Sequence, residues 1–471
     1  MKTIWLKLAL WIPCLLVWIG ISWFYPHPNF MSPDSESYIQ FAPMRTFLYP
    51  YLLWAFKDIF GNYDSISPFQ IFTYCFSFGL LGEAVHRFTK KWWMGFLIVL
   101  AGLANVFNYP EFVLLILTDS LFSTLLVLFF SLLLLYFDKK KISYIAGMST
   151  LIGIGICLRP VSYALVPLFV FILALSWPSV QQRLKMVLPA ILLPILISAL
   201  LQSYIHERHH GPNKNDLLGI TLFAKSAMMD QPPPAQYPAP EFGKDLQMVM
   251  RPKLDSLKDI PNSFNRFNTY RDIEGWAQYR YPPERLRQGA AEANTHSVES
   301  FMFETGKAYI KEYPFSYLKN ALYHDFGSWI IFDEREPSLL QFLIRSGILF
   351  IGAATLLVSI GGVFLTLWRG SAAMPENWKP IFLASLFMQG YTLLIGLSCI
   401  AVSRYLSAAW GPLILAAGLP SLMVLDWLFA RFVVASEPSG EHSFLQHTEK
   451  PCLPSDSVGR NTDHKDEPLR N

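Results

Sequence analysis

The sequence predicts an all-α membrane protein that crosses the bilayer many times, with interfacial helices and a small helical domain outside the membrane. Of its 471 residues, 52% are hydrophobic and only 15% are charged, whereas a water-soluble domain carries about 25% charged residues. The mean hydropathy is +0.31. The formal net charge of +3 comes without a basic stripe, so the composition excludes a nucleic-acid-binding protein as well as an ordinary soluble enzyme.

Apolar runs of about 20 residues, the length that crosses a bilayer, recur along the chain. Ten segments fit this description: 4–24, 67–84, 92–108, 113–137, 142–158, 161–177, 186–205, 346–368, 380–402 and 409–430. The fifth and sixth are separated only by Arg159-Pro160. The first is expected to be an uncleaved anchor, because no small-residue cleavage site precedes Ser22.

Lysine and arginine mark alternate connections between these segments, which by the positive-inside rule lie in the cytoplasm. The basic residues concerned are Lys2, Lys7, Arg87, Lys90, Lys91, Lys139, Lys140, Lys141, Arg183, Lys185, Arg369, Lys379 and Arg431. With ten spans, both termini are expected inside. The first loop, 25–66, and the long segment 206–336 are expected outside.

These boundaries divide the chain into four parts. We expect an N-terminal bundle of about seven helices over 1–205, an external, mostly helical domain over 206–336, about three helices over 337–431 and a disordered tail over 432–471. The aromatic run at 49–58 suits an interfacial helix, and 284–312 has the pattern of a helix. Because no cysteine lies in 206–336, a disulfide-stapled external domain is excluded.

Ionisable side chains that do not mark the cytoplasmic side gather at the outer membrane boundary, where such groups are costly and tend to be functional. Three are acids and four are arginines: Asp34, Glu36, Asp119, Arg45, Arg159, Arg345 and Arg404. Arginines can hold a phosphate through forked hydrogen bonds, and a carboxylate can accept a proton. The shared depth therefore predicts one polar cavity.

Plain structural roles are open for each of these residues. An arginine at a helix end can extend to lipid headgroups. Asp119 can act as a helix N-cap, and Asp34, in Ser32-Pro33-Asp34-Ser35, can be a turn residue.

A second motif competes with this site. His206-Glu207-Arg208-His209-His210 matches H-E-x-x-H, in which two histidines bind zinc and the glutamate acts as a base. That interpretation gives a membrane metalloprotease, with His206 and His210 as metal ligands. Gly211-Pro212 ends the helix at once and no third-ligand motif follows, so a solvated helix end is the alternative. No cofactor is otherwise indicated; a divalent metal ion held here that assists glycosyl transfer is a third alternative.

The first outer loop resembles that of GT-C glycosyltransferases, polytopic enzymes related to protein mannosyltransferases and lipid A aminoarabinose transferases. The resemblance is carried by Ser32-Pro33-Asp34-Ser35-Glu36-Ser37-Tyr38, Arg45 and Tyr49-Pro50, with Thr118-Asp119-Ser120, Leu158-Arg159-Pro160 and Ser403-Arg404-Tyr405 further on. It covers 1–210 and 313–430 loosely. The acids here read Asp-Ser-Glu rather than an adjacent pair, which leaves the role of Glu36 open.

The resemblance implies transfer of a sugar from a polyprenyl-phosphate donor to a lipid, glycan or protein acceptor at the outer face. It also implies that the carboxylate of Asp34 is catalytic. Chemically, Asp34 would be the base for an acceptor hydroxyl, with Glu36 and Asp119 as further catalytic candidates. Arg45, Arg159, Arg345 and Arg404 would bind the donor phosphate, and Tyr38, Tyr49 and Tyr405 the substrate. A single displacement would invert the anomeric centre.

The expected setting is a bacterial inner membrane with the site facing the periplasm, on the resemblance and the absence of any N-x-Ser/Thr triplet. The expected partners are the lipid-linked donor, the acceptor and membrane lipids, with no nucleic acid. A transporter or flippase, whose arginines would bind an anionic lipid headgroup, remains an alternative.

Overall fold

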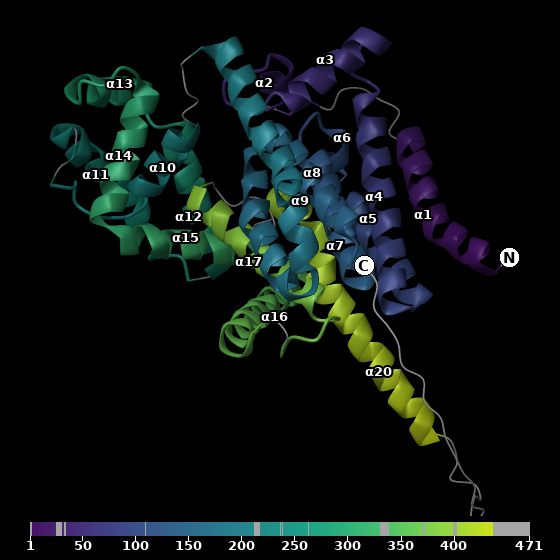
Figure 1. Ribbon diagram of the computed structural model, residues 1–471. Helices are drawn as coiled ribbons and strands as arrows, with labels where there is room; N and C mark the ends of the chain where they lie inside the picture. The colour runs from purple at the N-terminus through teal and green to yellow at the C-terminus, as the bar shows by residue number, and fades with distance from the viewer. Residues whose placement is uncertain are drawn as a thin grey trace, which may run out of the picture. The chain divides into compact units, whose positions relative to one another are not determined.

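The computed structural model describes residues 2–24, 31–32, 34–108, 110–211, 217–235, 237, 239–261, 263–329, 339–370, 373–398 and 403–436, some side chains within them excepted. Over these residues the secondary structure is helical throughout (Figure 1). The chain divides into two compact units, Met1–Met423 and Val424–Asn471. The described part of the second unit is the end of one helix, α20 (Leu419–Ser436).

The long apolar helices are α1 (Lys2–Phe24), α4 (Ile66–Thr89), α5 (Trp92–Asn108), α7 (Asp119–Lys139), α8 (Ile142–Leu158), α9 (Leu165–His210), α16 (Leu339–Arg369), α17 (Lys379–Ser398) and α20. Four described segments are long and apolar enough to cross a membrane, namely Asp119–Lys139, Ser346–Arg369, Lys379–Leu397 and Trp410–Arg431. Shorter apolar helices accompany them. The protein is therefore a helical chain compatible with an integral membrane protein.

The prediction of ten spans is not supported. The expected spans 161–177 and 186–205 belong, apart from residues 161–164, to one helix, α9. The Gln, Arg and Lys residues between them lower hydropathy but are good helix formers. The expected span 113–137 also begins too early: α6 (Glu111–Leu114) and an extended Leu115 precede α7. Asp119 therefore stands in the first turn of its helix.

The helix α7 forms the centre of the larger core, since most of its side chains are buried. It packs against α4 and α8, and α4 packs in turn against α5. The α4–α5 contact is very close: a Cβ added at Gly95 would collide with the carbonyl oxygen of Gly82. Small residues allow helices in a membrane to approach in this way.

Short helical elements connect the long helices. They are α2 (Ser35–Ile39), α3 (Leu48–Phe60), the 3₁₀ turn η1 (Pro160–Ala164), α18 (Ser403–Ala408), α19 (Trp410–Leu413) and the π-helical turn η3 (Ile414–Gly418). The helix α3 covers the aromatic run expected to be helical. Its buried face is formed by Tyr49, Pro50 and Leu53.

The segment expected outside the membrane, here called the outer segment, builds a second hydrophobic core of its own, here called the outer core. Its helices are α10 (Leu217–Ala227), α11 (Pro240–Asp255), α12 (Ser263–Tyr279), α13 (Pro283–Glu292), α14 (Val298–Glu312) and α15 (Pro314–Ser328) (Figure 1). The single helix expected over 284–312 is divided between α13 and α14, because Asn294 turns the chain with a positive φ. The Ser297 side chain then caps α14 by accepting from the Ser300 amide.

The outer core is attached to the membrane helices through α15 and α17. The hydroxyl of Tyr317 donates to the carbonyl oxygen of Leu397, and a Cβ added at Gly396 would collide with the carbonyl oxygen of Ala321. At the C-terminal end, α20 continues to Ser436, so residues 432–436, expected to be part of a disordered tail, are helical. Residues 437–471 lie outside the described chain.

Candidate functional site

A cavity of about 430 Å³, here called the main cavity, lies where the first outer loop meets the ends of several helices. Its charged and polar lining comes from α2 and the loop after it, the start of α7, the α8–η1 junction, α10, α17 and α18. The lining residues are Asp34, Tyr38, Met44, Arg45, Thr46, Leu117, Asp119, Leu158, Arg159, Pro160, Val161, Tyr163, Leu218, Thr221, Tyr391, Leu394, Ile395 and Tyr405. Segments that are far apart in the sequence therefore line the same cavity.

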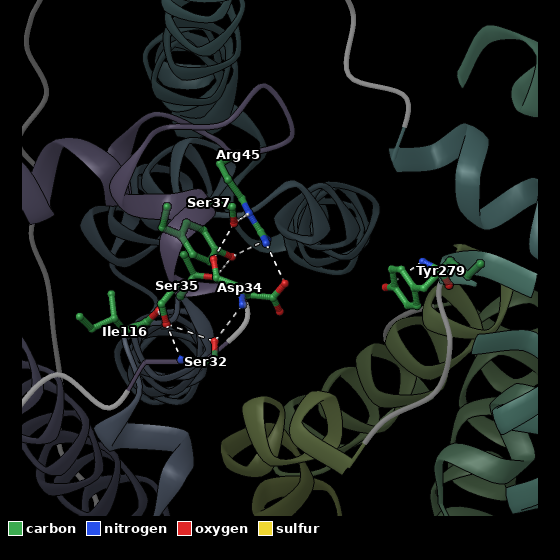
Figure 2. Close-up of polar contacts among 10 residues, drawn as sticks. Ser32, Asp34, Ser35, Ser37, Arg45, Ile116 and Tyr279 are labelled. Atoms are coloured by element: carbon green, nitrogen blue, oxygen red, sulfur yellow. Dashed lines mark hydrogen bonds and ion pairs between the residues drawn. The ribbon is translucent and has the colours of Figure 1, made fainter. Parts of the chain in front are cut away.

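The first charge pair in this cavity is Asp34 with Arg45. Nη2 of Arg45 lies 3.0 Å from Oδ1 of Asp34, its Nε donates to Ser37 Oγ at 2.9 Å, and Figure 2 shows Arg45 reaching both residues. The guanidinium also lies 4.1 Å over the ring of Tyr38. These contacts hold Arg45 within the protein, so it does not extend to lipid headgroups.

Asp34 does lie in a turn, which the Ser35 amide closes by donating to the carbonyl oxygen of Ser32 at 2.9 Å, but the Asp34 side chain does not stabilise it. It stands at the N-cap of α2 without a side-chain capping bond, and it is the Oγ of Ser32 that adds a side-chain hydrogen bond to the turn, accepting from the Asp34 amide at 3.2 Å (Figure 2). The Asp34 side chain is 38% exposed. Its carboxylate therefore remains accessible from the cavity while paired with Arg45.

The second pair, Asp119 with Arg159, is more deeply buried. Arg159 donates from Nη1 to Oδ1 of Asp119, and the side chains of Arg159 and Asp119 are 15% and 4% exposed. The Arg159 guanidinium lies 5.3 Å from the ring centroid of Tyr405. Thr118, not Asp119, occupies the N-cap position of α7, so the capping role is wrong for Asp119. Because Arg159 is buried and paired, it does not extend to lipid headgroups.

Hydrogen bonds fix the first outer loop to both helices that carry this second pair. Tyr38 accepts from Arg45 Nη1 at 3.0 Å, and its hydroxyl lies 3.0 Å from Thr118 Oγ1, next to Asp119. Ser35 donates to the carbonyl oxygen of Ile116 at 3.0 Å (Figure 2), and Thr46 donates to that of Leu158 at 2.6 Å. The two pairs are thereby held in one framework.

Several residues expected at this site lie elsewhere. Glu36 follows the buried Ser35 on α2 and is exposed, and its carboxylate accepts a hydrogen bond from Gln40 at 2.8 Å. It does not line the main cavity. Tyr49 is fully buried behind Tyr38 and donates to Gln70 at 2.7 Å. The helices α16 and α18 contain Arg345 and Arg404, whose side chains lie outside the described part of the chain.

Other lining residues gave no signal in the sequence. Tyr391 lies inside an apolar helix and reads as core, yet it faces the cavity and donates to the carbonyl oxygen of Tyr405 at 3.1 Å. Leu218 and Thr221 come from α10, in the outer segment. Only long-range packing brings them to the site, so hydropathy and spacing had no means of finding them.

The expected metal ligands His206 and His210 stand at the end of α9 with ring centroids 5.0 Å apart. The ring of His210 packs 4.7 Å from that of Phe41, and His209 is hydrogen-bonded to the Tyr51 hydroxyl at 2.8 Å. Within the described chain, no group of three or more His, Cys, Asp or Glu residues is placed to hold a metal ion. The histidines therefore pack against aromatic rings, and the described residues bring no third metal ligand to them.

The main cavity can serve an anionic, partly apolar ligand. Two guanidinium groups provide forked donors, and Asp34 provides an accessible carboxylate. The remaining wall is hydrocarbon, formed by Leu117, Leu158, Val161, Leu394 and Ile395. Comparisons of the chain with models of protein families, with curated proteins and with solved structures found no match.

Proposed function

We propose that the protein is a membrane glycosyltransferase that moves a sugar from a polyprenyl-phosphate donor to an acceptor at the outer face of the membrane. The observation that carries the proposal is the meeting of two Asp–Arg pairs in one cavity with a hydrocarbon wall. This combination matches a donor that is charged at its phosphate and apolar along its chain.

Asp34 is the proposed base. It is 38% exposed, against 4% for Asp119, so an acceptor hydroxyl can reach it within hydrogen-bond distance. As the acceptor oxygen forms its bond to the anomeric carbon, its proton passes to Asp34 and the bond to the donor phosphate breaks. One displacement of this kind inverts the anomeric centre.

The arginines are proposed to stabilise the departing phosphate. Arg45 and Arg159 are held by carboxylates and aromatic rings before the substrate arrives. Preorganised donors of this kind favour charge that develops in the transition state. Asp119 is proposed to position Arg159, since its Oδ1 is already occupied by that guanidinium.

The test compares Asp34→Asn with Glu36→Gln, a matched change on an exposed acid two residues away. Mass spectrometry of membrane lipids and surface glycans, with and without the gene, identifies the sugar and the donor. The Asp34→Asn protein is expected to accumulate donor and to lose the glycan product, whereas the Glu36→Gln protein retains activity. Full product formation by the Asp34→Asn protein would overturn the assignment of the base.

A second candidate is a transporter or flippase for anionic lipid-linked substrates. It is favoured by the burial of Arg159 between Tyr405 and Phe122, which suits binding a headgroup without any reaction. Such a protein would tolerate Asp34→Asn better than loss of Arg159, and it would move lipid without forming a glycosidic bond. Assays of product formation and of lipid movement on the same two variants separate the candidates.

A further inference from the structure

The helix α15 exposes an apolar stripe on the outer segment. The stripe is formed by Phe315, Leu318 and Leu322, here called the α15 stripe, which are 85%, 43% and 49% exposed. These residues are three and four positions apart, so their side chains lie on one face of the helix. A contiguous exposed apolar surface indicates contact with an apolar partner, whereas single exposed residues need none. The stripe is therefore a candidate contact surface.

A neighbouring face of α15 packs on one end of the apolar helix α17 (Figure 1). The Tyr317 hydroxyl donates to the carbonyl oxygen of Leu397, and a Cβ added at Gly396 would come within 3.1 Å of the Asp325 amide nitrogen. By the positive-inside rule, Lys379 marks the other end of α17 as the cytoplasmic one. The helix α15 is thereby fixed at the outer end of a candidate membrane span.

Beyond this contact the chain continues toward the middle of the membrane helices. A Cβ added at Gly352 of α16 would come within 2.7 Å of the Trp329 ring, and Gln389 of α17 donates to the carbonyl oxygen of Gly352 at 3.1 Å. Gln389 and Leu397 are eight residues apart on α17, which corresponds to about 12 Å of helix. Because a bilayer core is about 30 Å thick, the segment from Tyr317 to Trp329 runs from the outer end of α17 into the outer half of the span.

The ionisable residues of α15 fit a helix at this level. Lys319 is exposed beside the stripe, where its ammonium can extend to lipid phosphates while its methylene stem stays on apolar surface. His324 and Asp325 face protein instead: the His324 ring packs 5.3 Å from that of Tyr270 in the outer core, and Asp325 contacts Thr392 of α17. The exposed side of α15 therefore combines apolar residues with a lysine, which is typical of an interfacial helix.

We propose that α15 lies in the outer interface of the membrane, with the α15 stripe in contact with lipid acyl chains and Lys319 at the level of the phosphates. Two observations favour lipid as the partner. The stripe borders the face of α15 that packs on the outer end of a candidate span, and the chain beyond it enters the outer half of that span. The outer core would then rest on the membrane through α15. This placement does not depend on the proposed function, because a transporter would be seated in the same way.

The test uses the full-length protein in nanodiscs of phosphatidylcholine that carries a photoreactive diazirine on one acyl chain. After illumination and digestion, mass spectrometry locates the lipid adducts. Peptides that contain Leu318 and Leu322 are expected to carry adducts about tenfold more often than the peptide that contains Met248, because the diazirine is confined to the hydrocarbon core. Met248 is a matched control, since it is an apolar side chain 71% exposed on α11. Equal labelling of the three positions would overturn the placement of α15.

Variants at Leu322 distinguish lipid from water around the stripe. Leu322→Ala and Leu322→Glu lose the same leucine contacts, and both new residues are good helix formers. In water the two variants would melt at similar temperatures, whereas a carboxylate that faces lipid is costly. We therefore expect Leu322→Glu to melt below Leu322→Ala in nanodiscs, while Met248→Glu and Met248→Ala melt alike. A Leu322→Glu protein as stable as Leu322→Ala would contradict the proposal.

Pairing of two copies of the chain through the stripe makes a different prediction. The protein would then be a dimer in nanodiscs, Phe315→Ala would convert it to monomers, and the stripe would carry no lipid adducts until the dimer dissociates. That combination would overturn lipid as the partner. A mass of one chain per nanodisc for both the wild type and Phe315→Ala, together with adducts on α15, is the result expected here.

Discussion

Two of the places where the described chain buries charged side chains differ in how accessible the charges are. In the outer segment, Lys225, Glu274 and His324 form a buried triad with side chains 0–1% exposed, and none of the three lines the main cavity. At the main cavity, the Arg45–Asp34 and Arg159–Asp119 pairs line an open space of about 430 Å³. The burial of charged side chains alone therefore does not indicate a functional site. Charged side chains that line a cavity, where a ligand can reach them, do indicate one.

The charges of Lys225 and Glu274 compensate each other within the triad. Burial raises the pKa of Glu274, but Lys225 and then His324 outweigh this effect, and the net pKa is lowered. Burial lowers the pKa of His324 despite the opposing effect of Glu274. A neutral His324 and an ionised Lys225–Glu274 pair leave no net charge, so the triad is suited to holding α10, α12 and α15 together.

The largest expected effect breaks this triad. Lys225→Met leaves the Glu274 carboxylate buried without its cation and should lower the free energy of unfolding by about 3–5 kcal/mol. Thermal melting in detergent measures the loss. The double variant Lys225→Met/Glu274→Gln should recover part of it, because the uncompensated charge is removed; a double variant less stable than the single one would contradict the charge explanation.

At the main cavity the same kind of change should affect chemistry first. Arg159→Lys keeps a positive charge beside Asp119 but loses the forked donors, and product formation should fall about 10²–10³-fold, as when a transition-state donor is lost. Turnover of lipid-linked donor measures the rate. The matched control is Arg87→Lys, which alters the exposed Arg87–Glu83 pair on α4 and should leave the rate unchanged.

Acid should weaken the outer core. The folded-state pKa of His324 is lowered, so its stabilising contribution is complete above the unfolded pKa of about 6.5 and is lost as pH falls below that value. Glu274 acts in the same direction below about pH 4.3, its unfolded value. The melting temperature should therefore fall between pH 7 and pH 5.

His324→Gln should reduce that pH dependence, since glutamine does not titrate. A residual slope is expected from His206 and His210, whose pKa values burial also lowers. A variant whose melting temperature falls with pH as steeply as that of the wild type would show that His324 is not the titrating group.

The smallest effect is expected for Glu36→Gln. Its carboxylate is exposed and bonded to Gln40, and an exposed contact contributes about 0–1 kcal/mol. Both melting temperature and product formation should stay within error of the wild type. A strong loss of activity in this variant would give Glu36 a catalytic role that its position away from the main cavity does not suggest.

The sequence alone determined the helical class and much of the helix pattern. Expected bounds of 92–108 and 142–158 coincide with α5 and α8, because apolar length and a following Arg159-Pro160 break are local properties of the chain. It also placed Asp34, Arg45, Asp119 and Arg159 at one level, since charge is excluded from the apolar runs between them.

Only the tertiary structure decided which of those charges meet. Hydropathy measures solvent preference and not backbone continuity, so it divided α9 where the helix continues. A two-residue step separates Asp34, which lines the main cavity, from Glu36, which does not. Thr221 and Tyr391 reach the site through packing between distant segments. Which charged side chains pair, and which of them a ligand can reach, depend on contacts between residues far apart in the chain, and local sequence patterns do not encode these contacts.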